Sequence, residues 1–151
     1  YVASAWVLES SDIETLEDLG GMDSCHTGWL KSAGMLMPMG YLIGQGFVEV
    51  SGDDESIESL RTTIENHFGN ASIPSSGNPY YGYDGAFRCM TEGVGDVAFA
   101  KSTSFEDHCE GNDWCFDRSD YRMLSPVFGQ VPSHSIMVNR EMISENKVEI
   151  E

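Results

Sequence analysis

Short runs rich in apolar residues predict a set of β-strands. Residues 1–8 place Ala3, Ala5 and Val7 on one face of the first strand. Further strands are expected at residues 24–27, 96–100, 121–125 and 135–139. The run at 96–100 is almost wholly apolar, which is typical of a strand buried on both faces.

Helical periodicity marks two other segments. Residues 56–68 carry an apolar residue at every third or fourth position. This stripe consists of Ile57, Leu60, Ile64 and Phe68. A second helix is expected at residues 84–92, with Asp84 near its N-terminus, and a third begins after Thr27 with a small, glycine-marked first turn.

Strands separated by helices favour an α/β sandwich with a mixed sheet. The stretch 69–79 is rich in Gly, Pro and Ser and is expected to form a loop. With 151 residues, 40% of them hydrophobic, the chain is long enough for one core. No linker divides it, so we expect a single domain over residues 1–151. Its strand-like start, without an initiator methionine, suggests a mature or excised piece of a longer protein.

The charge balance excludes several classes of partner. Eight Lys and Arg residues face 25 Asp and Glu residues, a formal net charge of −17. Such a surface repels nucleic acids and anionic membranes and attracts cations. The same excess of carboxylates is also typical of a protein adapted to high salt, and the composition leaves this alternative open. No apolar run approaches the roughly 20 residues of a membrane span.

Four cysteines, at positions 25, 89, 109 and 115, point to an oxidising compartment. Their spacing lacks the CxxC pattern of a zinc site. Two disulfides are the favoured interpretation, pairing Cys25 with Cys89 and Cys109 with Cys115. Asn70 begins the sequence Asn-Ala-Ser, a candidate glycosylation site, which agrees with an extracellular or cell-surface chain.

The segment SCHTGWLKSAG, residues 24–34, has the composition of an anion-binding turn. Thr27 supplies a hydroxyl, and Lys31 supplies a positive charge one expected helical turn later. The small residues that follow are Ser32, Ala33 and Gly34, which allow an ion to approach their N–H groups. A capped helix without any ligand explains the same residues, so the pattern alone does not decide.

Two further clusters have both chemical and structural interpretations. Tyr80, Tyr81 and Tyr83 lie among glycines, either as a packed loop or as phenolate ligands for a hard cation. The methionines of MLMPM, residues 35–39, suggest copper, but adaptable core packing is the favoured interpretation. A serine hydrolase is disfavoured because the chain has no GxSxG motif.

Four blocks in a fixed order resemble the transferrin family. They are SCHTGWLKSAGMLMPMG, YYGYDGAFRC, EGVGDVAFAKST and GQVPSHSIMV. The resemblance runs from Tyr1 to about Arg140 and is to the second subdomain of one transferrin lobe, with divergent loops at 45–78 and 104–127. It implies a three-layer α/β subdomain similar to those of periplasmic binding proteins, with hinge strands near 1–8 and 132–140.

The resemblance also implies a metal site. In the family, iron is bound by a tyrosine on the first hinge strand, the tyrosine of the YGY block and the histidine of VPSH. These positions match Tyr1, Tyr83 and His134. A further aspartate ligand belongs to the first subdomain, which this chain lacks and which is therefore an implied partner.

The implied anion is carbonate, or bicarbonate from solution, which bridges protein and metal. Its family ligands match Thr27, Lys31, Ala33 and Gly34. Lys31 replaces the family's usual arginine, keeping the charge but losing the bidentate fork. We therefore expect carbonate to be retained, with weaker binding.

Other matches and departures concern cysteines and a lysine. The family disulfide between the two ligand blocks matches Cys25 and Cys89, whereas Cys109–Cys115 has no obvious counterpart. Lys101 matches a lysine that, in some members, pairs with a lysine of the other subdomain to trigger iron release in acid. Because that subdomain is absent, Lys101 is interpreted as a surface or cleft-edge residue.

The sequence therefore predicts a module that binds Fe3+ with carbonate, within an extracellular iron-transport protein. It is expected to transport the metal without catalysis, and a cell-surface receptor is an implied partner. The alternative is a transferrin-like scaffold that has lost iron and binds another anion or a small ligand. The presence of Tyr1, Tyr83 and His134 favours iron.

Overall fold

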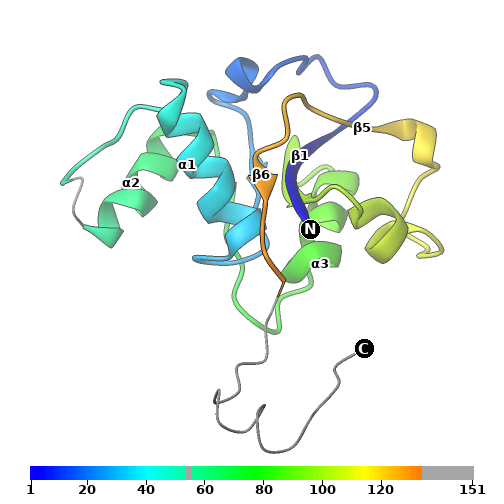
Figure 1. Ribbon diagram of the computed structural model, residues 1–151. Coiled ribbons are helices and arrows are strands. Elements are labelled where there is room, and N and C mark those ends of the chain that lie inside the picture. The colour runs from blue at the N-terminus through cyan, green and yellow to red at the C-terminus, as the bar shows by residue number, and fades with distance from the viewer. Residues whose placement is uncertain (54–55, 134–151) are drawn as a thin grey trace, which may run out of the picture.

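A mixed sheet forms the centre of the molecule (Figure 1). The computed structural model describes residues 1–53 and 56–133. The strands are β1 (Val2–Leu8), β2 (Ser24–Cys25), β3 (Ala71–Ser72), β4 (Val97–Lys101), β5 (Tyr121–Met123) and β6 (Gly129–Gln130). Their order is β3-β2-β4-β1-β5, and β6 also pairs with β1. Strand β2 is parallel to β3 and β4, whereas β1 is antiparallel to β4, β5 and β6.

Helices cover both faces of this sheet. The α-helices are α1 (Met37–Gly44), α2 (Ile57–His67) and α3 (Gly82–Thr91). Shorter helical turns are η1 (Leu16–Leu19), η2 (Ser32–Leu36), η3 (Phe105–Cys109) and η4 (Arg118–Asp120). Figure 1 shows α1 and α2 on one side of β1 and α3 on the other. None of the helices in the described part of the chain has the length and apolar character needed to cross a membrane.

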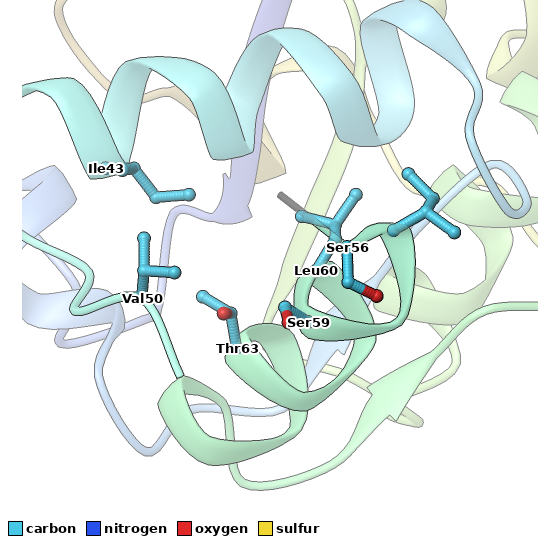
Figure 2. A pocket seen from close by; sticks show the side chains of 7 residues that line it. Ile43, Val50, Ser56, Ser59, Leu60 and Thr63 are labelled. Atoms are coloured by element: carbon cyan, nitrogen blue, oxygen red, sulfur yellow. The ribbon is translucent and has the colours of Figure 1, made fainter. Parts of the chain in front are cut away.

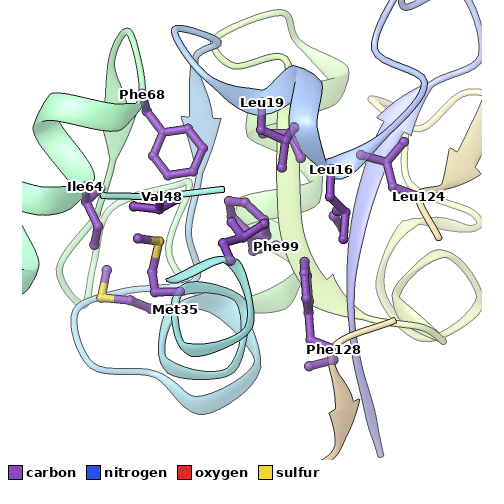
Figure 3. Close-up of a cluster of buried hydrophobic side chains, with 14 of the residues drawn as sticks. Leu16, Leu19, Met35, Val48, Ile64, Phe68, Phe99, Leu124 and Phe128 are labelled. Carbon is purple, nitrogen blue, oxygen red and sulfur yellow. The ribbon is translucent and has the colours of Figure 1, made fainter. Parts of the chain in front are cut away.

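The first core lies between the sheet and α1, α2 and η2. It includes Ala3, Ala5 and Val7, which were expected to share a face of β1, together with Phe99 from β4. Figure 3 shows Phe99 with Phe68, Phe128 and other side chains of this cluster. The ring of Phe99 lies within 6 Å of the rings of Phe68 and Phe128, at 5.8 and 5.9 Å between centroids.

The second core lies on the opposite face, under α3 and η3. Successive side chains of a strand point to opposite faces, so Trp6 of β1 and Ala98 of β4 belong to this core. Trp6 packs edge-on against Phe87 of α3, with ring centroids 5.2 Å apart. Residues 3–7 of β1 are all buried because two helical layers cover it. The three-layer α/β architecture agrees with the sequence-based expectation.

Two helices differ in detail from the expectation. Residues 28–31 are not helical, so Lys31 precedes the helix that begins at Ser32 instead of lying one turn inside it. On α2, Ile57 is 50% exposed although the apolar stripe placed it in the core. The helix instead buries Thr63, whose hydroxyl accepts a hydrogen bond from the Ser51 N–H at 3.0 Å.

Several short elements differ from the sequence prediction. Strand β3 interrupts the stretch expected to be a loop, and β6 was not expected. Strand β6 pairs with the first residues of β1. Just after β6, the Val131 N–H donates a hydrogen bond to the Tyr1 carbonyl at 2.7 Å. The strand expected at 135–139 and most of the returning hinge strand lie outside the described residues.

Candidate metal and anion site

Residues that the sequence singled out from three separate segments line one hollow of about 270 Å³. Tyr1 comes from the start of β1, Thr27 and Lys31 follow β2, and Tyr83 lies in the first turn of α3. The remaining lining residues are Ser32, Tyr81 and Gly82. The fold therefore brings together four of the residues expected to bind metal or anion.

Thr27 is buried with its hydroxyl unused. Its side-chain oxygen has no hydrogen-bond partner among the described residues, although the residue is only 3% exposed. A buried polar atom without a partner is costly unless a ligand or water completes it. The Thr27 carbonyl accepts a hydrogen bond from Gly82 N–H at 2.9 Å, which joins this loop to the start of α3.

The turn after Thr27 has an unusual backbone that brings the helix start against the threonine. Gly28 has a φ of 143° and Leu30, a non-glycine residue, a φ of 58°. A Cβ added at Gly34 would overlap the Thr27 side chain, so only glycine fits at this position. Because the first N–H groups of a helix lack intrahelical acceptors, those of Ala33 and Gly34 remain available to an anion at this turn.

A buried histidine supports the turn from behind. The His26 Nδ1 atom lies 2.8 Å from the Gly34 carbonyl oxygen, and its Nε2 atom lies 3.0 Å from the Ser24 hydroxyl. Burial lowers the pKa of His26 to about 4, partly opposed by the Gly34 contact, so the imidazole is neutral at neutral pH. His26 therefore acts as a structural support for the turn.

Positive charge is present on both sides of the hollow. The Lys31 Nζ atom lies 5.4 Å from the centre of the Tyr81 ring. Although Lys31 is exposed, this contact keeps its ammonium group near the turn that follows Thr27. The Lys101 Nζ atom lies 4.4 Å from the Tyr83 ring centre and 5.5 Å from that of Tyr1. Lys101 thus lies against two of the tyrosines that line the hollow.

The two expected tyrosine ligands are neighbours. The rings of Tyr1 and Tyr83 meet edge to face, with centroids 6.4 Å apart. Burial is the main cause that raises the pKa of Tyr83, and hydrogen bonding to Tyr1 and its charge add to the effect. The Tyr83 phenol therefore keeps its proton until a strong cation competes for the oxygen.

The other predicted residues lie elsewhere or outside the described range. His134 lies outside the described residues, whereas Asn70 is exposed and donates its side-chain N–H to Asp23 at 3.0 Å. The structure contains both expected disulfides, Cys25–Cys89 and Cys109–Cys115. The first joins β2 to α3, the two elements that carry Thr27 and Tyr83 to the hollow.

A larger hollow, of about 450 Å³, lies between α1 and α2 and involves none of the predicted site residues (Figure 2). It is lined by Ile43, Val50, Ser56, Ile57, Ser59, Leu60 and Thr63. These side chains offer no charge to a metal or anion, so we do not assign the site here. Within residues 1–53 and 56–133, no group of three or more His, Cys, Asp or Glu side chains is placed to hold a metal ion.

Sequence reasoning missed one contact of the expected metal ligands. His108 of η3 stacks on Tyr83, with ring centroids 5.5 Å apart and an angle of 18° between the planes. No local pattern around residue 108 could have shown this contact, because it depends on how η3 packs against α3.

Comparison with known proteins decides the family. The sequence model of the transferrin family matches residues 1–78 and 72–148, nearly the whole chain. The chain belongs to the transferrin family. Members of this family are iron-binding transport proteins, typically secreted or attached to the cell surface.

The similarity extends to individual transferrins over short parts of their length. The chain is 36% identical to human lactotransferrin over 176 residues, covering 97% of this chain and 25% of that protein. It is 30% identical to human melanotransferrin, covering 91% of this chain and 24% of that protein. Transferrin 1 from Manduca sexta has the same fold over 82% of this chain and 25% of its own, with a TM-score of 0.69 at 21% identity. The chain spans about a quarter of the length of these relatives.

Proposed function

We propose that this transferrin-family chain binds ferric iron together with carbonate, in the hollow formed by Tyr1, Thr27, Lys31 and Tyr83. The observation that carries the proposal is the buried Thr27 hydroxyl, which has no partner among the described residues and lies in the same hollow as Lys31 and three tyrosines, Tyr1 and Tyr83 among them. A hydroxyl, an ammonium group and free N–H groups suit a small anion, and phenolates suit a hard trivalent cation.

Charge and donor counts support this pairing. Two phenolates and a carbonate dianion carry four negative charges together, enough to neutralise the three positive charges of Fe3+. Tyr1, Tyr83 and His134 supply three donors and a bidentate carbonate supplies two. The sixth position of an octahedral ion is left for the aspartate of the first subdomain, or for water in this chain alone.

The wider role is part of the same proposal. The chain acts as one subdomain of an extracellular iron-transport protein that binds and releases the metal without catalysis. The first subdomain of the lobe is its structural partner, and a cell-surface receptor is a partner of the whole protein. Carbonate with iron is favoured over a scaffold that binds another anion alone, because Tyr1 and Tyr83 border the anion turn.

The direct test is removal of one phenol. Tyr83→Phe keeps the ring but removes an anionic ligand, so it should abolish most ferric binding in the presence of bicarbonate while leaving the circular dichroism spectrum unchanged. Tyr80→Phe is the matched control, because the Tyr80 hydroxyl bonds Glu92 at 2.8 Å and is not part of the hollow. Iron affinity in Tyr83→Phe within a few-fold of wild type would refute the role of Tyr83.

A further inference from the structure

His108 lies against the tyrosine that we assign to iron. Its ring is half-buried and stacks on Tyr83 in a nearly parallel arrangement, 5.5 Å between centroids and 18° between planes. Its Nε2 atom is buried and has no hydrogen-bond partner within the described residues. Stacking on Tyr83, not a hydrogen bond from Nε2, is therefore the specific contact that this imidazole makes.

The backbone around His108 is closely tied. The Asn112 side chain donates to the His108 carbonyl at 2.9 Å, and the Glu110 N–H donates to the Phe105 carbonyl at 2.9 Å. The next residue, Cys109, is buried and bonded to Cys115. These contacts fix the position of η3 and present the His108 ring to Tyr83 from a rigid loop.

Tyr83 packs against both hydrophobic cores, and two further neighbours, Tyr1 and Lys101, border its ring. The Tyr1 ring approaches it edge-on, with ring centroids 6.4 Å apart. Tyr1 itself is 43% exposed and immediately precedes β1. Lys101 approaches with a long, flexible side chain whose ammonium group lies 4.4 Å from the ring centre. A parallel ring restricts the tilt of an aromatic side chain more than a mobile cation does.

We propose that His108 is a positioning residue for Tyr83: its ring holds the phenol in the orientation that binds iron. The inference rests on the proposed function, because it gives the stacking a role in metal binding. A metal ligand held in place by packing loses less conformational freedom on binding than a free one. His108 thus strengthens iron binding without touching the metal.

The test compares three substitutions. His108→Leu replaces the flat ring by an apolar side chain that is not planar. His108→Phe restores a flat ring. His67→Leu is the matched control, since His67 also has a buried, unpartnered Nε2 atom but its ring packs against Phe68 at 4.8 Å. Circular dichroism and unfolding curves establish that each variant is folded.

The first readout needs no iron. The proton resonances of the Tyr83 ring, assigned by their loss in Tyr83→Phe, lie in the ring current of His108. They should lose the ring-current shift in His108→Leu, keep a ring-current shift in His108→Phe, and stay unchanged in His67→Leu. Unchanged Tyr83 resonances in His108→Leu would overturn the positioning role.

The second readout is ferric binding with bicarbonate. His108→Leu should weaken iron binding roughly three- to tenfold, the scale of one aromatic pair, and shift the visible iron–phenolate band. His108→Phe should restore both, and His67→Leu should change neither. Affinity in His108→Leu within twofold of wild type overturns the inference. If the wild-type chain takes up no iron, the proposed function is overturned instead. The Tyr83 resonances still show in that case whether His108 contacts Tyr83.

Discussion

At the scale of single residues, the Thr27 hydroxyl is buried and has no hydrogen-bond partner among the described residues, which supports the proposal that the hollow accepts a ligand. Gly34 packs directly against it, and Lys31 immediately precedes the helix that begins at Ser32. Each residue has a local reason for its identity: a hydroxyl for the anion, no side chain for close approach, and a charge at the rim. Two of these local features can be tested by substitution: the charge of Lys31 and the buried imidazole of His26.

Lys31→Gln should weaken carbonate-dependent iron binding by about 1–3 kcal/mol, the scale of one charge-assisted hydrogen bond. The fold should persist because Lys31 is exposed. Lys31→Arg is the control: it keeps the charge and restores the bidentate fork usual in the family, so iron binding should be equal or tighter. Iron titrations at fixed bicarbonate measure the difference, and equal affinities for Gln and Lys would exclude Lys31 from the anion site.

The buried His26 should make stability depend on pH in mildly acidic solution. Its pKa is about 4 in the folded chain, below the usual 6.5. Between these values the unfolded chain binds a proton that the folded chain does not, so stability is lost as pH falls from 6.5 towards 4, by up to about 3 kcal/mol. Above pH 6.5 this contribution vanishes.

Urea unfolding at pH 7, 6 and 5 tests this dependence. Burial also lowers the pKa of His67, so the diagnostic quantity is the difference between wild type and His26→Gln. The variant should be less stable at pH 7, because a buried contact is changed, but should lose less stability on acidification. Parallel pH curves for the two proteins would show that His26 is not the neutral group responsible.

At the scale of elements, the disulfide Cys25–Cys89 links β2 to α3 across 64 residues of sequence. Replacing both cysteines by Ala should cost about 2–4 kcal/mol of folding stability, chiefly by freeing the unfolded chain. The Cys109–Cys115 pair closes a separation of only six residues, so its double replacement should cost less. Denaturant midpoints under non-reducing conditions measure both, and an equal or larger loss for the short loop would contradict this account.

The longer elements were predictable because their apolar pattern is local. Strands β1 and β4 were expected from short apolar runs, α2 from its helical periodicity, and α3 from a helix start near Asp84. Strands β3 and β6, of two residues each, have no such pattern and exist because they pair with longer neighbours. The non-helical turn before Ser32 depends on a left-handed Leu30, a conformation that composition does not reveal.

The candidate site was predictable by family resemblance more than by physical pattern. Thr27 and Lys31 by themselves are equally consistent with a capped helix, and the tyrosines with a packed loop. The structure adds that Tyr1, Thr27, Lys31 and Tyr83 border one hollow. The contact of His108 with Tyr83 joins η3 to α3 and depends on tertiary packing, which single-sequence patterns do not encode.

At the scale of the whole molecule, the proposed function makes the hollow one side of a cleft between two subdomains. The chain covers about a quarter of each transferrin relative, and the opposing subdomain would supply the sixth ligand and close over the metal. The isolated chain should therefore bind iron more weakly and exchange it faster than a complete lobe. The residues proposed to hold the anion all lie within the described part of the chain, so the dependence on carbonate should survive.

The measurement that tests this account most directly is the visible spectrum after addition of ferric iron, with and without bicarbonate. Iron–phenolate bonds absorb visible light, and the anion supplies charge and donors that the remaining protein groups cannot replace. A salmon-coloured absorption band should appear with bicarbonate, be absent from rigorously carbonate-free buffer, and be lost in Tyr83→Phe. Tight iron binding of equal strength in carbonate-free buffer, or no band under either condition, would contradict the account.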